Sequence, residues 1–216
     1  MLTVLVDYDS GNLHSAEKSF QRMSAEVGGG EILVSSKPED VARADRIVLP
    51  GDGAFPACRN ALTSDREALF EAIVDGVINK SRPFMGICVG MQMMATWGRE
   101  YEDTKGFDWI GGEIAKITPS DATLKIPHMG WNDLELGAAG LQHPVLSGIE
   151  TGAHAYFVHS YSFRVSDPAH RLAHVDYGGD ITAVVGRDNM IGMQFHPEKS
   201  QATGLRMIAN FLNWAP

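Results

Sequence analysis

A cysteine stands between two glycines where an apolar segment meets a helix-like pattern, in the run Met85-Gly86-Ile87-Cys88-Val89-Gly90-Met91. The spacing Gly-x-Cys-x-Gly is typical of a nucleophile elbow, a sharp strand-to-helix turn, with sulfur replacing the serine oxygen. Small residues at Gly86 and Gly90 fit this turn because a side chain there would collide with it. The turn directs Cys88 toward the first amides of the helix, which stabilise a thiolate. The pattern predicts a candidate nucleophile on an α/β sheet, with a buried cysteine beside a glycine-rich turn as the alternative.

The first half of the chain alternates short apolar strands with helical patterns. Strands are expected at residues 3–7, 31–35, 46–49 and 83–87, and helices at 13–23, 38–44, 67–80 and from the elbow to about Trp97. This alternation predicts a parallel sheet. The second half has short strands at 113–117, 156–158, 172–175, 181–185 and 190–195 and a closing helix at 203–214. We therefore expect an α/β fold in one domain, residues 1–216, with an open, mostly parallel sheet flanked by helices and some antiparallel strands.

Composition excludes several classes of function. The 216 residues carry a net charge of -9 with no basic cluster, which argues against nucleic acid or an anionic membrane as the main partner. No apolar run approaches the roughly 20 residues that span a bilayer, and the start lacks a signal peptide, so a cytoplasmic protein is expected. In a reducing compartment Cys58 and Cys88 are not expected to pair, and neither has metal-ligand spacing.

A second candidate site follows the last predicted strand, at Phe195-His196-Pro197-Glu198. Pro197 favours an extended His196, and residues two apart in an extended segment face the same side. His196 and Glu198 can thus present an imidazole beside a carboxylate, which leaves one ring nitrogen free to act on a thiol. This segment and the elbow both come at carboxyl ends of predicted strands, where α/β sheets place their sites. The sequence predicts a Cys-His-Glu triad, with a simple strand-end turn as the alternative for His-Pro-Glu taken alone.

With these motifs the chain strongly resembles the class-I (triad) glutamine amidotransferases. The resemblance rests on Pro50-Gly51-Asp52-Gly53, on residues 86–92 and on His196-Pro197-Glu198, in the family's order and over nearly the whole chain. Within the family it resembles the glutaminase subunits of imidazole glycerol phosphate synthase, from histidine biosynthesis. The stretches that carry this finer resemblance are residues 7–13, 126–132, 157–161 and 196–200.

The resemblance implies a role for each site residue. Cys88 attacks the side-chain amide of glutamine, His196 moves the proton and Glu198 orients His196, through a γ-glutamyl thioester that water hydrolyses. Backbone donors for the oxyanion are expected from Val89 and from the Gly51-Asp52 segment. The residues expected to hold or border the substrate are Gly53, Gln92, Ser160 and Tyr161.

Asp52 departs from the family, which usually has an apolar residue at this position. A carboxylate directed at the developing oxyanion would be unfavourable. We therefore expect its side chain to point outward, with only its backbone amide in use.

The resemblance also implies a partner. Ammonia would pass to a separate (β/α)₈ cyclase subunit, in a heterodimer, and no cofactor or metal is expected. Docking is expected at Pro127, Met129 and Trp131, which could alternatively fill a core, and Lys199 is expected near the interface or as a solvated charge. Three other functions stay open: a class-I amidotransferase that serves another synthase, a binding subunit that has lost turnover, and a partner-free γ-glutamyl peptidase.

Overall fold

A mixed nine-stranded sheet forms the centre of the computed structural model, which describes residues 1–216. The strand order is β2-β1-β3-β4-β13-β12-β11-β8-β9. The first five of these strands are parallel: β2 (Glu31–Ser35), β1 (Leu2–Val6), β3 (Arg46–Leu49), β4 (Phe84–Ile87) and β13 (Met190–Met193). The remaining four pair antiparallel: β12 (Asp180–Arg187), β11 (Arg171–Asp176), β8 (His128–Leu136) and β9 (Ala153–His159). The expected α/β fold is confirmed, with a larger antiparallel part than the sequence indicated.

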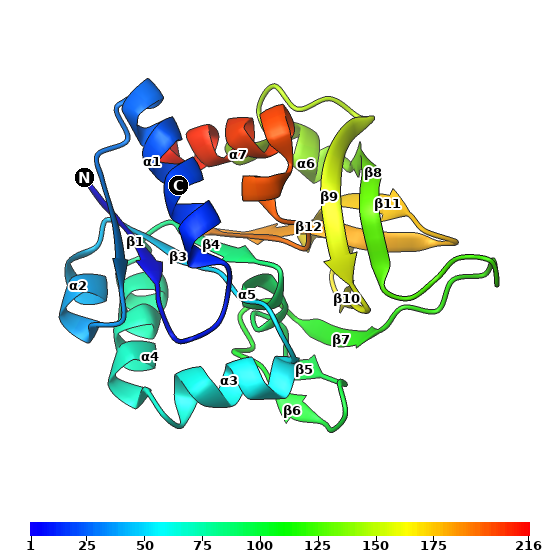
Figure 1. The fold of residues 1–216 in the computed structure, drawn as a ribbon, viewed down its shortest axis with the longest axis horizontal. Coiled ribbons are helices and arrows are strands. Elements are labelled where there is room, and N and C mark those ends of the chain that lie inside the picture. The colour runs from blue at the N-terminus through cyan, green and yellow to red at the C-terminus, as the bar shows by residue number, and fades with distance from the viewer.

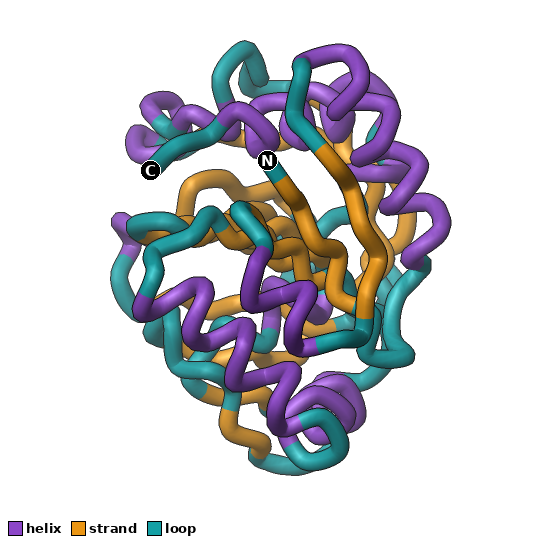
Figure 2. The backbone as a smooth tube through the Cα atoms, turned by 90° about the vertical axis from the view of Figure 1, so that its left-hand side faces the viewer, coloured by secondary structure: helices purple, strands orange, loops and turns teal.

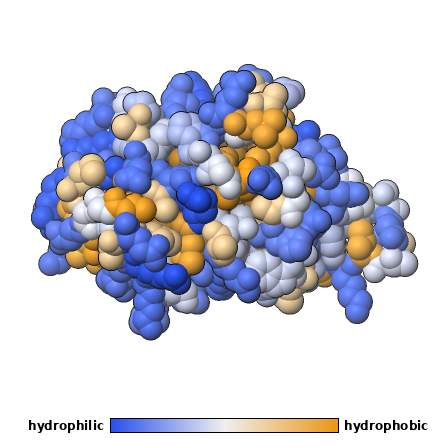
Figure 3. All heavy atoms as spheres, turned by 90° about the horizontal axis from the view of Figure 1, so that it is seen from above, coloured by the Kyte–Doolittle hydropathy of each residue, from blue (hydrophilic) through white to orange (hydrophobic).

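Helices cover both faces of the parallel half, as Figures 1 and 2 show. On one face α1 (Leu13–Val27) packs against α7 (Gln201–Asn213). On the other lie α2 (Pro38–Arg43), α3 (Phe55–Thr63) and α4 (Glu67–Val74), which continues into a π-helix at Asp75–Asn79. Because both faces are covered, the parallel strands are mainly apolar, and every residue of β1, β3, β4 and β13 is buried. Seen over α1 and α7, the surface is mostly hydrophilic with scattered hydrophobic groups (Figure 3).

A smaller four-stranded sheet beside the first was not expected from the sequence. It contains β10 (Tyr161–Val165), β7 (Gly112–Lys116), β5 (Trp97–Gly98) and β6 (Thr104–Lys105), in that order. The shorter connecting helices are α5 (Val89–Gln92), α6 (Ala138–Gln142) and three 3₁₀ turns at Pro144–Leu146, Pro168–His170 and Pro197–Lys199. None of the helices is both long and apolar enough to cross a bilayer.

The helix expected from the elbow to Trp97 is wrong, because α5 ends at Gln92. The next residues are fully buried, but their carbonyl groups accept hydrogen bonds from another loop rather than from the next helical turn. The Phe107 amide donates to the Met93 carbonyl, and the Trp109 amide donates to the Met94 carbonyl. An apolar run packed under a loop is therefore not distinguished from a buried helix by its sequence.

Candidate active site

Cys88 lies at the junction of β4 and α5 in a conformation that non-glycine residues rarely adopt. Its φ is 54° and its ψ is -111°, and such strain typically persists at functional sites where the surroundings enforce it. The two flanking glycines are required: a Cβ would lie 1.8 Å from the Leu49 carbonyl oxygen at Gly90 and 2.7 Å from the Gly90 oxygen at Gly86. The strand-to-helix elbow predicted from the sequence is what the backbone forms.

The other two predicted triad residues lie next to the same sheet edge. His196 follows β13, which pairs in parallel with β4, so its position and that of Cys88 are at neighbouring carboxyl ends. The His196 Nδ1 atom lies 2.8 Å from Glu198 Oε1, and the two side chains are only 6% and 3% exposed. The carboxylate thus holds one ring nitrogen and leaves Nε2 for the thiol.

The electrostatics of this group favour a protonated His196 ring. Burial of the His196 ring by itself lowers the pKa, but hydrogen bonding and charge interaction with Cys88 and Glu198 outweigh burial and raise it to about 10. A raised histidine pKa means that the ring stays protonated throughout the neutral range. The positive ring next to Cys88 stabilises the charged, nucleophilic form of its sulfur.

This charge state gives a test at neutral pH. Alkylation of Cys88 by iodoacetamide at pH 7 is expected to be at least about tenfold faster than that of Cys58, because a protonated His196 ring stabilises negative charge on Cys88 while burial raises the pKa of Cys58. Glu198→Gln removes one interaction that raises the His196 pKa, so Cys88 alkylation at pH 7 should slow by about tenfold or more. Peptide mapping by mass spectrometry gives both rates. Equal rates for the two cysteines would contradict activation of Cys88 by His196.

The backbone of His196 is fixed by a buried serine. Ser200 is 1% exposed, and its hydroxyl donates to the His196 carbonyl oxygen at 2.7 Å and accepts from the Tyr156 amide at 3.0 Å. The His196 amide in turn donates to the Tyr156 carbonyl oxygen at 3.2 Å. Strand β9 therefore positions the imidazole through two main-chain contacts.

A cavity of about 330 Å³ opens at the triad. Its lining includes Cys88 and His196 and six of the residues expected to hold the oxyanion or the substrate: Asp52, Gly53, Val89, Gln92, Ser160 and Tyr161. Gly51 is not in the lining but lies directly beneath it, since its carbonyl oxygen accepts a hydrogen bond from the Val89 amide. The structure thus brings together residues that the sequence separates by more than a hundred positions.

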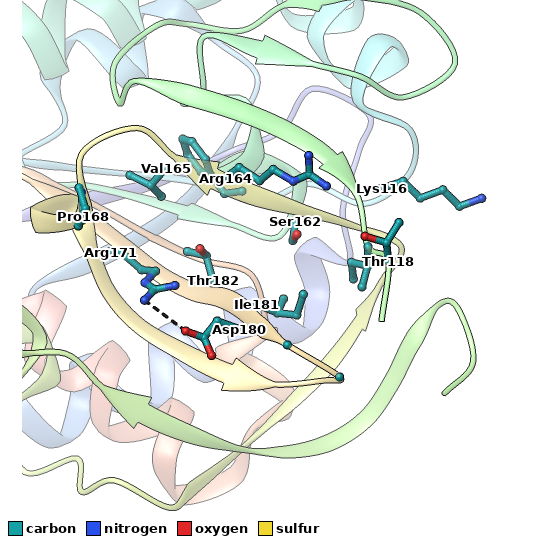
Figure 4. A pocket seen from close by; sticks show the side chains of 14 residues that line it. Lys116, Thr118, Ser162, Arg164, Val165, Pro168, Arg171, Asp180, Ile181 and Thr182 are labelled. Atoms are coloured by element: carbon teal, nitrogen blue, oxygen red, sulfur yellow. Dashed lines mark ion pairs between the residues drawn. The ribbon is translucent and has the colours of Figure 1, made fainter. Parts of the chain in front are cut away.

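A larger hollow of about 390 Å³ lies elsewhere, between β10 and the β11–β12 hairpin (Figure 4). No cysteine or histidine lines it. Its three cations do not converge: Arg171 pairs with Asp180 at 3.5 Å, Arg164 lies 3.8 Å from Glu113, and Lys116 points away from the hollow. Of these two cavities, only the smaller contains a cysteine and a histidine.

Neither expected oxyanion donor is free in this structure. The Val89 amide donates to the Gly51 carbonyl oxygen at 3.3 Å, and the Asp52 amide donates to the Ser10 hydroxyl at 3.2 Å. The Ser10 hydroxyl donates back to the Asp52 carbonyl oxygen at 2.7 Å. The Asp52 side chain is held by the loop at Gly11, whose amide donates to its Oδ1 at 2.8 Å. If these two amides are to hold an oxyanion, the Gly51–Asp52 peptide must first turn.

Comparison with known proteins decides the family. The model of the family described as glutamine amidotransferase class-I matches residues 4–214. This chain belongs to the class-I glutamine amidotransferase family. Two curated relatives, from Cereibacter sphaeroides and Ruegeria pomeroyi, are 70% and 63% identical over the whole of both chains, and each is named imidazole glycerol phosphate synthase subunit HisH.

Solved structures agree on the fold. A structure titled glutamine amidotransferase covers 98% of this chain and 99% of its own, with a TM-score of 0.69 at 18% identity. The structure of PurLQS from Thermotoga maritima covers 98% of this chain and 97% of its own, with a TM-score of 0.67 at 17% identity. At these identities the likeness supports the amidotransferase fold alone.

The residues expected at the amidotransferase's docking surface are exposed rather than packed in a core. Met129 and Trp131 on β8 are 62% and 48% exposed, and Pro127 and Lys199 are also exposed. Pro127 additionally lines the cavity that contains Cys88. The exposed edge at β8 is therefore continuous with the mouth of the active-site cavity.

Some residues of the site were missed at the level of sequence. Ser10, Ser200 and Gln194 make hydrogen bonds to the oxyanion segment, to His196 and to Cys88. The available signal was polarity at positions of expected burial, and Gln194 in particular lies within a predicted apolar strand. No group of three or more His, Cys, Asp or Glu side chains in the amidotransferase could hold a metal ion.

Proposed function

We propose that this chain is the glutaminase subunit of imidazole glycerol phosphate synthase and supplies ammonia to a cyclase subunit in histidine biosynthesis. The observation that carries the proposal is the cavity that joins Cys88 and His196 to Pro127, next to strand β8, on which Met129 and Trp131 are exposed. The names of the relatives at 70% and 63% identity support this synthase over others. The whole chain, 1–216, acts as one amidotransferase domain, consistent with the family match to residues 4–214.

The reaction starts at the sulfur. The Cys88 thiolate attacks the side-chain amide carbon of L-glutamine, and the carbonyl oxygen becomes a tetrahedral oxyanion. The protonated His196 gives its proton to the departing nitrogen, so that ammonia leaves and a γ-glutamyl thioester remains. His196 then takes a proton from water, hydroxide attacks the thioester, and glutamate is released with return of the thiol proton to the His196–Cys88 pair. Glu198 holds the ring through Nδ1 during both transfers.

Substrate contacts follow from the free polar groups of the cavity. Gln92 uses both hydrogens of its amide nitrogen within the protein, on Tyr161 O at 3.2 Å and Gln194 Oε1 at 3.0 Å. Its Oε1 atom is the group left to accept from the amide or ammonium group of glutamine. Ser160, Tyr161 and Gly53 border the same space.

The partner is a (β/α)₈ cyclase that docks on the surface formed by Pro127, Met129, Trp131 and Lys199. Trp131 is an exposed aromatic and Lys199 an exposed cation, and an aromatic centre with a charged or polar rim is typical of protein interfaces. The heterodimer works in the cytoplasm.

Reconstitution tests the proposal. The purified chain mixed with a cyclase subunit should co-elute in size exclusion and support glutamine-dependent formation of imidazole glycerol phosphate. The cyclase alone should form the product only with added ammonium salts. Full glutaminase turnover without any partner would instead favour a γ-glutamyl peptidase, and stimulation only by a different synthase subunit would assign another pathway.

A further inference from the structure

Gln194 is a fully buried amide with no role in the chemistry derived so far. It follows β13, two residues before His196, and its exposed fraction is 0%. Its Nε2 lies 3.7 Å from Cys88 Sγ and donates to it, and its Oε1 accepts from Gln92 Nε2 at 3.0 Å. A buried side-chain amide is costly unless it is hydrogen-bonded, so these contacts account for its presence in an apolar interior.

The orientation of this amide is imposed by its neighbours. The Tyr161 carbonyl can only accept, so the Gln92 group that faces it at 3.2 Å must be the NH₂. The second hydrogen of that NH₂ donates to Gln194, which must therefore present its oxygen to Gln92. The NH₂ of Gln194 is left facing the sulfur. The Tyr161 carbonyl therefore determines, through Gln92, that Gln194 turns its NH₂ group toward Cys88.

The same carbonyl anchors a chain that reaches the docking strand. His159 Nδ1 donates to Tyr161 O at 2.9 Å, so His159 Nε2 accepts from His128 Nδ1 at 3.1 Å. His128 Nε2 then accepts from the Asn132 amide at 3.3 Å. Burial lowers the pKa of both rings to about 4, so each stays neutral with one donor and one acceptor. Each hydrogen bond in the chain from Asn132 on β8 to the Cys88 sulfur therefore has one defined donor and one defined acceptor.

We propose that Gln194 is a further catalytic residue, the amide donor that holds the Cys88 thiolate together with His196. The proposal rests on the proposed glutaminase chemistry of Cys88 and deepens it. Gln194 keeps its own protons throughout. It stabilises the sulfur twice: in the resting ion pair, and when the C–S bond of the tetrahedral intermediate breaks during thioester hydrolysis and its electron pair returns to sulfur. A hydrogen bond to a charged group in a buried site is stronger than one between neutral groups.

Two variants of the same shape separate this role from packing. Gln194→Met removes both polar atoms. Gln194→Glu keeps an oxygen that accepts from Gln92, and in its ionised form it has no donor for the sulfur. Each is expected to lower kcat of the reconstituted enzyme by about 10- to 100-fold, the loss of one charge-assisted hydrogen bond, with KM changed by less than about threefold. For Gln194→Glu the loss should deepen as pH rises, since an ionised carboxylate repels the thiolate.

Alkylation of the chain alone gives a second readout that packing would not move. The rate of Cys88 alkylation at pH 7 should fall by about tenfold or more in Gln194→Met, because the sulfur loses its amide donor. Met193→Leu, a packing change on the same strand end, is the matched control and should keep the wild-type rate. Wild-type kcat and a wild-type alkylation rate in folded Gln194→Met would overturn the proposal. If wild type itself lacked glutaminase activity, the proposed function would fail, while the alkylation rates would still decide the contact between Gln194 and Cys88.

Discussion

Cys88→Ala is expected to lower glutamine-dependent synthesis by the reconstituted enzyme about 10⁴-fold or more, because no other group can form the thioester. The loss should fall on chemistry alone. Alanine fits the elbow without the sulfur, and the Cys88 main-chain contacts, such as its amide to the Met193 carbonyl at 2.7 Å, do not need a side chain. Partner binding should therefore persist, since the exposed residues of β8 are untouched.

Ammonia separates the two halves of the proposed reaction. Synthesis from added ammonium salts should proceed in the Cys88→Ala complex at the wild-type rate, because that route bypasses the thioester. Cys58→Ala is the matched control: it removes the other buried sulfur, which contacts the Asp52 carbonyl at 3.3 Å but no triad residue, and at least a tenth of the activity should remain. Persistent glutamine-dependent turnover in Cys88→Ala would show that the nucleophile is another group.

The sequence predicted those parts of the site that depend on local backbone geometry. The elbow at Cys88 could be predicted because only glycine fits at positions 86 and 90, where a Cβ would meet backbone atoms. The pairing of His196 with Glu198 was predicted, but the extended segment on which the prediction relied is wrong beyond His196. His196 itself is extended, whereas Pro197–Lys199 forms a 3₁₀ turn, and the two side chains still meet at 2.8 Å. Their meeting with Cys88 depended on the pairing of β13 with β4, which the order of elements along the chain does not itself specify.

Other parts depended on contacts between distant segments and could not be predicted. The strand β8 was missed because one face is open to solvent and its apolar residues Met129 and Trp131 point outward rather than into a core. The second sheet was missed because β5 and β6 have two residues each and are defined only by their pairing. Ser10, Ser200 and Gln194 acquire their roles through hydrogen bonds to segments that no spacing in the sequence encodes.

The chain alone is expected to hydrolyse glutamine at least about 10²- to 10³-fold more slowly than its complex with the cyclase and the cyclase's nucleotide ligand, because the loss of even one oxyanion donor has that effect. Both expected donors are occupied in the structure: the Val89 amide by the Gly51 carbonyl and the Asp52 amide by Ser10. Turning the Gly51–Asp52 peptide breaks both contacts at once and leaves the donors free. A partner that favours the turned state then raises kcat by stabilising the transition state, while coupling to its own ligand prevents waste of glutamine.

Glutaminase rates measured with and without the cyclase test this prediction. A variant on the proposed docking surface tests whether the stimulation depends on that surface. Trp131→Ala should leave the slow rate of the chain alone unchanged and weaken binding of the cyclase by more than about 30-fold, as for an aromatic interface centre. Ile78 on the π-helix is 46% exposed, against 48% for Trp131, and serves as the matched control. The Ile78→Ala variant should bind the cyclase as tightly as wild type. Equal turnover with and without the cyclase would mean that the Gly51–Asp52 peptide turns freely in the isolated chain, and that the partner does not control the oxyanion site.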